Sequence, residues 1–493
     1  MSAVRIPHPA LSAWPASQRD ALPLALWTSA AIAEATGGTA SGDFQCAGIE
    51  IDSRDVRNGD LFFALKGEAM DGHRFIDKAF ENGAAAAVVD RPVPWPHVLV
   101  EDTTAALHAL AAAARTRSKA IRIGVTGSVG KTGVKEAIFA ALDRCSFGAT
   151  HRSVRSYNNH VGVPLSLARM PARSRFGVFE MGMNHAGEIS GLTTQVKPNV
   201  AVITTIAPAH IENLGSMEAI ADAKAEIFAG LEPGGIAVIP ADSEYFGQLR
   251  DRAQALGARV VSFGRDGAAD VRLLDTIPSA DGGSLVTADM GDTRVCYTVA
   301  EPGEHWIANS LAVMAAVRAV GGDLGAAGLA LAEMGGLKGR GARHRIPAPG
   351  GKALLIDESY NANPASMRAT LRQLGHTPAT RRIAVLGSMK ELGDFAPKFH
   401  AQLAELLAEA QVDYAILVGE EMRALARHLG KGGAGALAGG LSFAHCDGPA
   451  EAIAALEDFG LTAGDAVLVK GSNSIGLGRL VAHFTGRQSG RDD

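Results

Sequence analysis

One short loop limits the folds open to this chain more than any other feature. The loop at residues 127–132, Gly-Ser-Val-Gly-Lys-Thr, follows an apolar run at 121–126 and precedes a helical pattern that extends to Leu142. Glycines let backbone N–H groups turn toward phosphate oxygens, and the following helix adds its positive N-terminal end. The order strand, loop, helix therefore predicts an α/β domain that binds ATP, with Lys131 reaching the β- and γ-phosphates and the Thr132 hydroxyl binding Mg²⁺.

The loop departs from the general phosphate-loop pattern at one position. The pattern GxxxxGK[ST] has a glycine where this chain has Val125, so a glycine-rich turn with an ordinary surface lysine is the alternative interpretation. A P-loop kinase or GTPase would also carry a Walker B aspartate and a guanine-reading Asn-Lys-x-Asp motif, and neither is evident. The strand before the loop and the helix after it still favour ATP binding.

The rest of the chain indicates three α/β domains. A chain of 493 residues is too long for one hydrophobic core, and apolar runs alternate with helical patterns, which is typical of mostly parallel sheets covered by helices. We expect an N-terminal extension at 1–25, a small mixed α/β domain at 26–115, a central P-loop domain at 116–335 and a Rossmann-like domain at 336–493. Strands are expected at 49–52, 61–65, 178–181, 200–203, 236–239, 353–356, 383–386, 414–418 and 466–469, with an antiparallel edge within 258–300 and a loop at 430–440.

Charge and cysteine usage exclude several classes of protein. The formal net charge of −5 argues against a general nucleic-acid binder, because affinity for a phosphate backbone rests on a basic surface. The four cysteines form no CxxC pair, which favours reduced thiols in the cytosol. No basic segment followed by an apolar run begins the chain, and no stretch approaches the roughly 18 consecutive apolar residues of a membrane helix. We therefore expect a cytoplasmic protein that acts on small-molecule substrates and does not insert into membranes. We also expect it to be a monomer.

Several further motifs, taken with the loop, resemble those of the Mur ligase family. The loop of that family reads G-[ST]-x-G-K-[ST], which removes the requirement for glycine at position 125. The resemblance covers nearly the whole chain from about residue 26, and it implies that the first domain binds a UDP-linked substrate. The matching segments are Asp52-Ser53-Arg54, Tyr-Asn-Asn-His-Val-Gly-Val-Pro at 157–164, Glu-Met-Gly-Met-Asn at 180–184, Ala-His-Ile-Glu at 209–212, Asp-Ala-Lys-Ala-Glu-Ile at 222–227, Gly339-Arg340 and Ser-Tyr-Asn-Ala-Asn-Pro at 359–364.

The resemblance implies an ATP-dependent amide ligase of peptidoglycan precursor synthesis. ATP would phosphorylate the C-terminal carboxylate of UDP-N-acetylmuramoyl-tripeptide, and the amine of D-alanyl-D-alanine would attack the resulting acyl phosphate. Phosphorylation supplies the leaving group that a carboxylate lacks, and cations must surround the transfer between two anions. The third residue of the tripeptide, diaminopimelate or lysine, stays open.

The main alternative within the family is the member that adds the third amino acid. That enzyme shares the Asp-Ser-Arg motif, but it should carry Tyr-Ala-His-Thr-Pro where this chain has Tyr-Asn-Ala-Asn-Pro at 360–364. It should also carry an Asp-Asn-Pro loop in its last domain, which this chain lacks. A non-catalytic nucleotide-binding module would have no use for Glu180, His210 and Lys224 together. The dipeptide-adding activity is therefore the expected one.

A magnesium site is expected around Glu180. This residue ends an apolar strand, where α/β sheets bind their ligands, and a buried carboxylate without a cation would be costly. In the family the residues matching Glu180 and His210 hold Mg²⁺, and the lysine matching Lys224 is carbamylated and binds a second ion. The resemblance thus implies two Mg²⁺ ions held by Thr132, Glu180, His210 and carbamylated Lys224. A structural histidine and a solvated lysine are the alternatives for His210 and Lys224.

The resemblance also implies the remaining ATP contacts. Asn309 matches an adenine-contacting asparagine, and Arg340 matches an arginine that reaches the γ-phosphate, although Arg343 and Arg345 lie nearby and the choice among them stays open. Either Asp357 or Glu358 is expected at the ribose. The residues expected to bind ATP are Gly127, Ser128, Val129, Gly130, Lys131, Thr132, Gly133, Asn309, Arg340, Asp357, Glu358 and Tyr360, and those expected to be catalytic are Lys131, Glu180, His210, Lys224 and Arg340.

The substrate contacts implied by the resemblance lie in all three domains. Ser53 and Arg54 would bind the uridine diphosphate end, since a guanidinium donates two hydrogen bonds to a pyrophosphate, and a surface turn is the alternative. Asn473 stands where the family usually has arginine, which puts a role for that position in doubt. The remaining expected substrate-binding residues are Asn158, Asn159 and His160 on the phosphate and sugar side, and Asn361 and Asn363 in the cleft for ATP and the dipeptide.

Overall fold

The computed structural model describes residues 25–67, 70–154, 156–279, 282–430 and 441–486. The chain forms two compact units, residues 1–113 and 114–493. The expected N-terminal extension and nearly all of the expected loop at 430–440 lie outside the described residues. The boundary expected near residue 335 falls within the second unit and stays a prediction. No helix of the described residues is long and apolar enough to cross a membrane.

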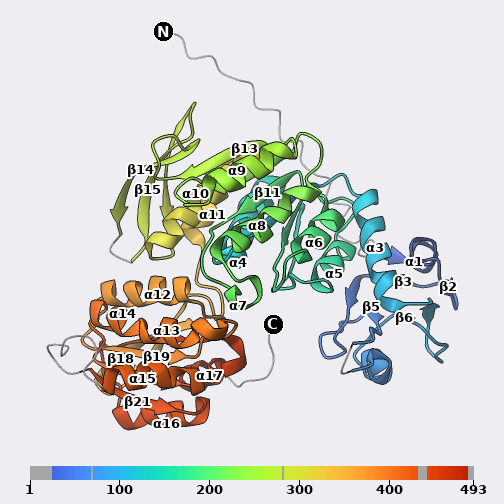
Figure 1. The fold of residues 1–493 in the computed structure, drawn as a ribbon. Coiled ribbons are helices and arrows are strands. Elements are labelled where there is room, and N and C mark those ends of the chain that lie inside the picture. Colours follow the sequence, from blue (N-terminus) through green and yellow to red (C-terminus); the bar gives the residue numbers. More distant parts are fainter. Residues whose placement is uncertain (1–24, 68–69, 155, 280–281, 431–440, 487–493) are drawn as a thin grey trace. The chain divides into compact units, whose positions relative to one another are not determined.

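The first unit is a small α/β fold built on a five-stranded sheet of order β2-β7-β6-β5-β4 (Figure 1). Its strands β4 to β7 are parallel, and β2 pairs antiparallel with β7. The Thr28 hydroxyl caps the first helix, which ends at Gly37 with φ 68°. The elements are β1 (Trp27–Thr28), α1 (Ser29–Thr36), β2 (Thr39–Ala40), β3 (Gln45–Cys46), β4 (Gly48–Glu50), β5 (Asp60–Phe63), η2 (Gly72–Phe75), α2 (Ile76–Glu81), β6 (Ala86–Val89), β7 (His97–Leu99) and α3 (Thr103–Arg117).

The second unit begins with a nine-stranded sheet of order β16-β15-β14-β13-β12-β11-β8-β10-β9. Strands β8 to β13 run parallel, and β14, β15 and β16 form the antiparallel edge that the sequence predicts. The strands are β8 (Ile121–Thr126), β9 (Thr150–Arg152), β10 (Phe176–Glu180), β11 (Val200–Ile203), β12 (Ile236–Pro240), β13 (Arg259–Gly264), β14 (Val271–Pro278), β15 (Ser284–Asp289) and β16 (Arg294–Val299).

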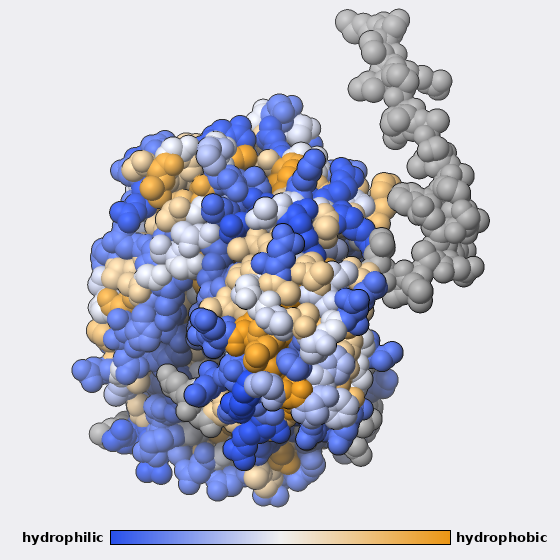
Figure 2. Space-filling view, turned by 90° about the vertical axis from the view of Figure 1, so that its right-hand side faces the viewer, coloured by the Kyte–Doolittle hydropathy of each residue, from blue (hydrophilic) through white to orange (hydrophobic). Residues whose placement is uncertain are grey.

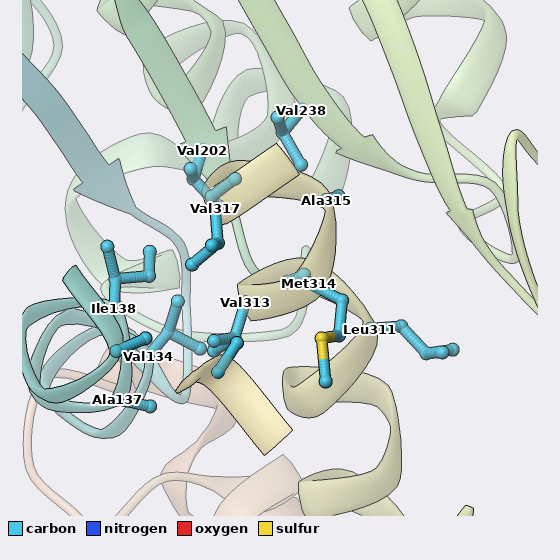
Figure 3. Close-up of a cluster of buried hydrophobic side chains, with 14 of the residues drawn as sticks. Val134, Ala137, Ile138, Val202, Val238, Leu311, Val313, Met314, Ala315 and Val317 are labelled. Carbon is cyan, nitrogen blue, oxygen red and sulfur yellow. The ribbon is translucent and has the colours of Figure 1, made fainter. Parts of the chain in front are cut away.

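Helices α4 (Lys131–Ser146) and α10 (Glu304–Ala319) are packed into the main core beside this sheet. Figure 3 shows Val134 and Ile138 of α4 against Val313 and Val317 of α10, with Val202 of β11 close by. Burying each such side chain contributes about 1.5–3 kcal/mol, so the helix that follows the phosphate loop is held rigidly. The other helices are α5 (Gly162–Ala168), α6 (Glu188–Val196), α7 (Ile211–Leu214), α8 (Met217–Ala225), η3 (Glu226–Gly230), α9 (Phe246–Ala255) and α11 (Leu324–Glu333).

A six-stranded sheet of order β17-β18-β22-β19-β20-β21 completes the second unit. It is parallel except for β17, and hydrophobic clusters cover both faces, as expected for a Rossmann-like domain. The elements are β17 (Ala342–Ala348), β18 (Gly351–Glu358), α12 (Pro364–His376), β19 (Arg382–Gly387), η4 (Gly393–Phe395), α13 (Ala396–Ala401), α14 (Leu403–Glu409), β20 (Tyr414–Val418), η5 (Glu420–Met422), α15 (Arg423–Gly430), β21 (Ser442–Cys446), α16 (Pro449–Phe459), β22 (Ala466–Lys470), η6 (Asn473–Ile475) and α17 (Gly478–Thr485).

Polar side chains cover most of the face drawn in Figure 2, and hydrophobic residues gather there only in small groups. Scattered surface apolar residues are normal in globular proteins. In α/β sheets, ligands bind at the carboxyl ends of the parallel strands, so the functional site is expected there.

Candidate active site

The phosphate loop is fixed by its own glycines and by the segment after β11. Gly127 has φ 144°, and a Cβ there would lie 2.0 Å from the Thr204 hydroxyl oxygen. The Thr204 hydroxyl donates to the Val129 carbonyl (2.5 Å), and the Ser128 hydroxyl donates to the Ala207 carbonyl (2.8 Å). The loop is thus held open for backbone N–H groups to face a bound phosphate.

Lys131 and Gly133 begin the helix that the loop leads into. The Lys131 ammonium turns back to donate to the Gly127 carbonyl (2.7 Å), and burial lowers its pKa although Glu180 opposes this. A Cβ at Gly133 would lie 2.7 Å from the Trp306 ring, so this glycine allows α10 to approach closely. Asn309 of α10 lies beside Gly130, where the expected adenine contact would be.

Glu180 ends β10 beside the phosphate loop and is 1% exposed. Its two carboxylate oxygens accept hydrogen bonds from the Thr132 hydroxyl and the Asn158 side-chain amide, both at 2.8 Å. Its backbone N–H donates to the Ser153 hydroxyl (3.1 Å). These donors are neutral, and a buried carboxylate held by neutral groups is suited to receive a cation.

His210 and Lys224 lie on the segments that follow β11. His210 precedes α7 with φ 57°, and its Nδ1 contacts the Glu391 carboxylate without forming an aligned hydrogen bond. Lys224 of α8 is completely buried, and in the described part of the chain its Nζ has no hydrogen-bond partner. Burial, followed by the nearby charge of Lys131, holds the Lys224 pKa well below its ordinary value, which favours the neutral amine.

The side chains as they stand offer an incomplete cation site. Within the described ranges, no cluster of three or more His, Cys, Asp or Glu side chains is placed to hold a metal ion. Thr132 and Glu180 supply oxygens and His210 a ring nitrogen, whereas Lys224 is an orphaned amine that does not line the cavity with Glu180 and His210. A carbamate on that amine would add the missing carboxylate, so the residues fit Mg²⁺ on that condition.

One cavity of about 260 Å³ gathers most of the expected ATP-binding residues. It lies between the nine-stranded and six-stranded sheets of the second unit. A larger opening of about 600 Å³ lies at the other end of α10, but there Arg272 and Arg318 are paired with Asp289 and Asp292. The smaller cavity is the candidate site, lined among others by Ser128, Val129, Gly130, Lys131, Gly133, Asn158, Glu180, His210, Asn309, Arg340, Glu358, Tyr360, Asn361 and Asn363.

Arg340 is the arginine that faces this cavity. Its guanidinium carbon lies 4.3 Å from the centre of the Tyr360 ring, and it donates to the Ser156 hydroxyl (3.3 Å). Arg343 interacts instead with the buried Glu301, and Arg345 lies on β17 away from the lining of the cavity. The geometry therefore favours Arg340 for the γ-phosphate, which stays a prediction.

The two neighbouring acidic residues, Asp357 and Glu358, also make different contacts. The Asp357 carboxylate accepts hydrogen bonds from the Gly339 N–H (2.9 Å) and from the Ser359 N–H (3.1 Å) and hydroxyl (2.6 Å), so it fixes the backbone around Gly339. Glu358 lines the cavity, 3.5 Å from Lys470. Burial raises the Glu358 pKa, and Lys470 opposes this. The geometry favours Glu358 over Asp357 for contact with ATP.

Two expected substrate residues of the second unit, Asn159 and His160, do not line the cavity. Asn159 caps the start of α5 by accepting from the Gly162 N–H (2.8 Å), and His160 is exposed. In the first unit Ser53 is buried, while the Arg54 guanidinium is paired with Asp52. Their substrate roles stay predictions.

The cavity also contains residues that the motifs did not identify as ligands. Ser156, His305, Trp306 and Lys470 line it. Burial lowers the His305 pKa to about 4, so its ring is neutral. Lys470 donates to the Asn361 carbonyl (3.0 Å). A lysine at the end of the apolar strand β22 was the signal that could have located this residue.

Glu301 gives the second unit a pH-dependent stability. Burial, opposed by Arg343 and reinforced by Glu358, raises its pKa to about 7 from 4.5. The folded state then binds the extra proton, so the free energy of unfolding falls as pH rises from 4.5 to 7, by up to about 3 kcal/mol. Glu301→Gln is expected to melt at a higher temperature than the unmodified chain at pH 8 and at a similar temperature at pH 5. An equal difference at both pH values in thermal melts would contradict this.

Three comparisons relate the chain to known proteins. Family models described as Mur ligase family catalytic domain, Mur ligase middle domain, and Mur ligase glutamate ligase domain match residues 45–117, 125–317 and 344–473. A Synechocystis protein named UDP-N-acetylmuramoyl-tripeptide–D-alanyl-D-alanine ligase is 37% identical over 90% of this chain and 93% of its own length, and the Escherichia coli protein of that name is 35% identical over 79% and 85%.

Solved structures agree with this relationship. MurF from Acinetobacter baumannii superposes with a TM-score of 0.80 at 30% identity, covering 94% of this chain and all of that one. MurF from Thermotoga maritima in complex with ADP superposes with a TM-score of 0.71 at 27% identity, covering 89% of this chain and 97% of that one. The likeness extends over both units of the chain.

Proposed function

Since this chain belongs to the Mur ligase family, we propose that it is an ATP-dependent ligase that adds D-alanyl-D-alanine to UDP-N-acetylmuramoyl-tripeptide. The observation that carries the proposal is the convergence of Lys131, Glu180 and Arg340 on one cavity. A phosphate loop, a buried carboxylate and an arginine are the groups that phosphoryl transfer to a carboxylate requires. The product is a precursor of peptidoglycan.

The proposed reaction has two steps. A carboxylate oxygen of the tripeptide attacks the γ-phosphorus of ATP, ADP leaves, and an acyl phosphate forms. The amine of D-alanyl-D-alanine then attacks the acyl carbon, phosphate leaves, and the amine loses a proton as the amide forms. Lys131 and Arg340 both line the cavity, so they would offset the charge that builds up between the two anions.

The cation site belongs to the same proposal. Thr132, Glu180, His210 and a carbamylated Lys224 would hold Mg²⁺, with two ions as the expected number. Bound there, Mg²⁺ would supply positive charge to the phosphate oxygens. The Thr132 hydroxyl and the Asn158 amide keep the Glu180 carboxylate oriented beside the phosphate loop.

The proposal also assigns the remaining contacts with the nucleotide and the substrates. Asn309 and Glu358 would contact adenine and ribose, and Ser53 and Arg54 the uridine diphosphate. Asn361 and Asn363 would face the incoming dipeptide. A monomer acting in the cytoplasm fits substrates that are soluble nucleotide-linked peptides.

A substrate-dependence assay tests the proposal. The purified chain is expected to release phosphate from ATP only when UDP-N-acetylmuramoyl-tripeptide and D-alanyl-D-alanine are both present, because phosphate leaves only when the amine attacks the acyl phosphate. The comparison reaction contains the UDP-dipeptide and meso-diaminopimelate. Equal phosphate release in that reaction would reject the proposal in favour of the ligase that adds the third residue.

A further inference from the structure

A lysine that no motif singled out lies completely buried one turn beyond Lys131. Lys135 of α4 is 0% exposed, and its ammonium donates to the Ser153 carbonyl (2.8 Å) and pairs with Glu136 (2.7 Å). Lysine is almost never fully buried without a paired role, because removing its charge from water is expensive. The position is therefore specified by the contacts that Lys135 makes.

Ser153, the residue that Lys135 contacts, connects three parts of the candidate site, and we call it the junction. Ser153 follows β9 and is itself 0% exposed. Its N–H donates to the Val178 carbonyl of β10 (2.9 Å), and its hydroxyl accepts from the Glu180 N–H (3.1 Å). The Lys135 ammonium, the strand β10 and the backbone of Glu180 thus fix three different groups of one serine.

The chain beyond this junction returns to the same carboxylate. Asn158 donates to the Glu180 carboxylate (2.8 Å), and its own carbonyl accepts from the Gly182 N–H (2.8 Å). Ser156 meets the Arg340 guanidinium. A shift of Ser153 would therefore disturb Glu180 through its backbone, through Asn158, and at the contact with Arg340.

We propose that Lys135 is a positioning residue of the ligase, which holds Ser153 and thereby fixes the Glu180 carboxylate toward Thr132. The inference rests on the proposed function for the role of Glu180, and on the hydrogen bonds of Lys135, Ser153 and Glu180 for everything else. A methionine at position 135 fills a similar volume but leaves the Ser153 carbonyl without its cation. The Glu180 carboxylate then loses its fixed orientation, although the phosphate loop itself is intact.

Nucleotide binding measured with and without metal separates positioning from mere stability. Lys135→Met is expected to weaken ADP binding about tenfold in the presence of Mg²⁺, as is typical when a support of a metal ligand is lost. ADP binding in EDTA should stay close to that of the unmodified chain, because the phosphate loop is intact. The matched control is Ile138→Ala on the same helix, which removes core packing. That variant is expected to lose stability without a Mg²⁺-selective loss of ADP binding.

A second variant keeps the proposal testable if Lys135→Met does not fold. Ser153→Ala removes the hydroxyl that receives the Glu180 N–H while keeping the buried ion pair, and it should show the same Mg²⁺-selective loss. An unchanged Ser153→Ala, or equal losses in Lys135→Met and Ile138→Ala, would overturn the proposal. These measurements need only ADP and Mg²⁺, so they remain informative even if the substrate assay rejects the proposed reaction.

Discussion

Lys131→Ala is expected to lower ATP-dependent phosphate release by about a hundredfold or more, the size of effect seen when one electrostatic donor is removed from a transition state. The Lys131 ammonium lies in the cavity within the phosphate loop, at 2.7 Å from the Gly127 carbonyl. Burial lowers its pKa, and a bound phosphate anion would oppose that shift by stabilising the charged form. The measurement is phosphate release with both proposed substrates at saturating ATP.

A surface lysine provides the control for this experiment. Lys398 of α13 is exposed and lies outside the lining of the cavity, so Lys398→Ala should keep the full rate. Thermal melts of both variants should match the unmodified chain, since neither lysine belongs to a hydrophobic core. Undiminished phosphate release by Lys131→Ala would remove the phosphate-loop assignment.

Local sequence patterns were sufficient to predict the framework of the site. The strand, loop and helix at β8 and α4 follow from an apolar run, glycines and a helical pattern that are adjacent in the chain. The structure also explains the departure at Val125. This residue lies within β8, fully buried and in register with Glu180, so a side chain fills the core at this position.

Contacts between distant segments could not be predicted in the same way. The sequence alone does not distinguish Arg340, Arg343 and Arg345 as the arginine expected at the γ-phosphate. That assignment depends on where β17 begins and on which arginine interacts with Glu301. The sequence does not separate Asp357 from Glu358, because the hydrogen bond from the Gly339 N–H that occupies Asp357 joins residues 18 positions apart. The contact of Lys135 could not be predicted because its partner Ser153 is separated from it by the rest of α4 and by β9.

Lys224→Ala is expected to lower phosphate release by about a hundredfold, since it would remove a proposed metal ligand and not only one of its supports. The structure supplies the conditions that carbamylation requires. Burial, followed by the nearby charge of Lys131, lowers the pKa of this amine, which is completely buried and has no hydrogen-bond partner among the described residues; the neutral form that attacks carbon dioxide is thereby favoured. One N–C bond forms, one proton is released, and the neutral amine becomes an anionic carbamate.

Chemical rescue tests this conversion of charge directly. The cavity left by Lys224→Ala can admit a small carboxylate, so acetate is expected to restore part of the phosphate release, whereas chloride at the same ionic strength should not. Mass spectrometry of the unmodified chain under native conditions should find one added carbon dioxide, which Lys224→Ala lacks and Lys352→Ala, a change on the exposed start of β18, retains. Full activity of Lys224→Ala, or a chain with no added mass that turns over normally in carbonate-free buffer, would mean that the Glu180 site binds its cation without a carbamate.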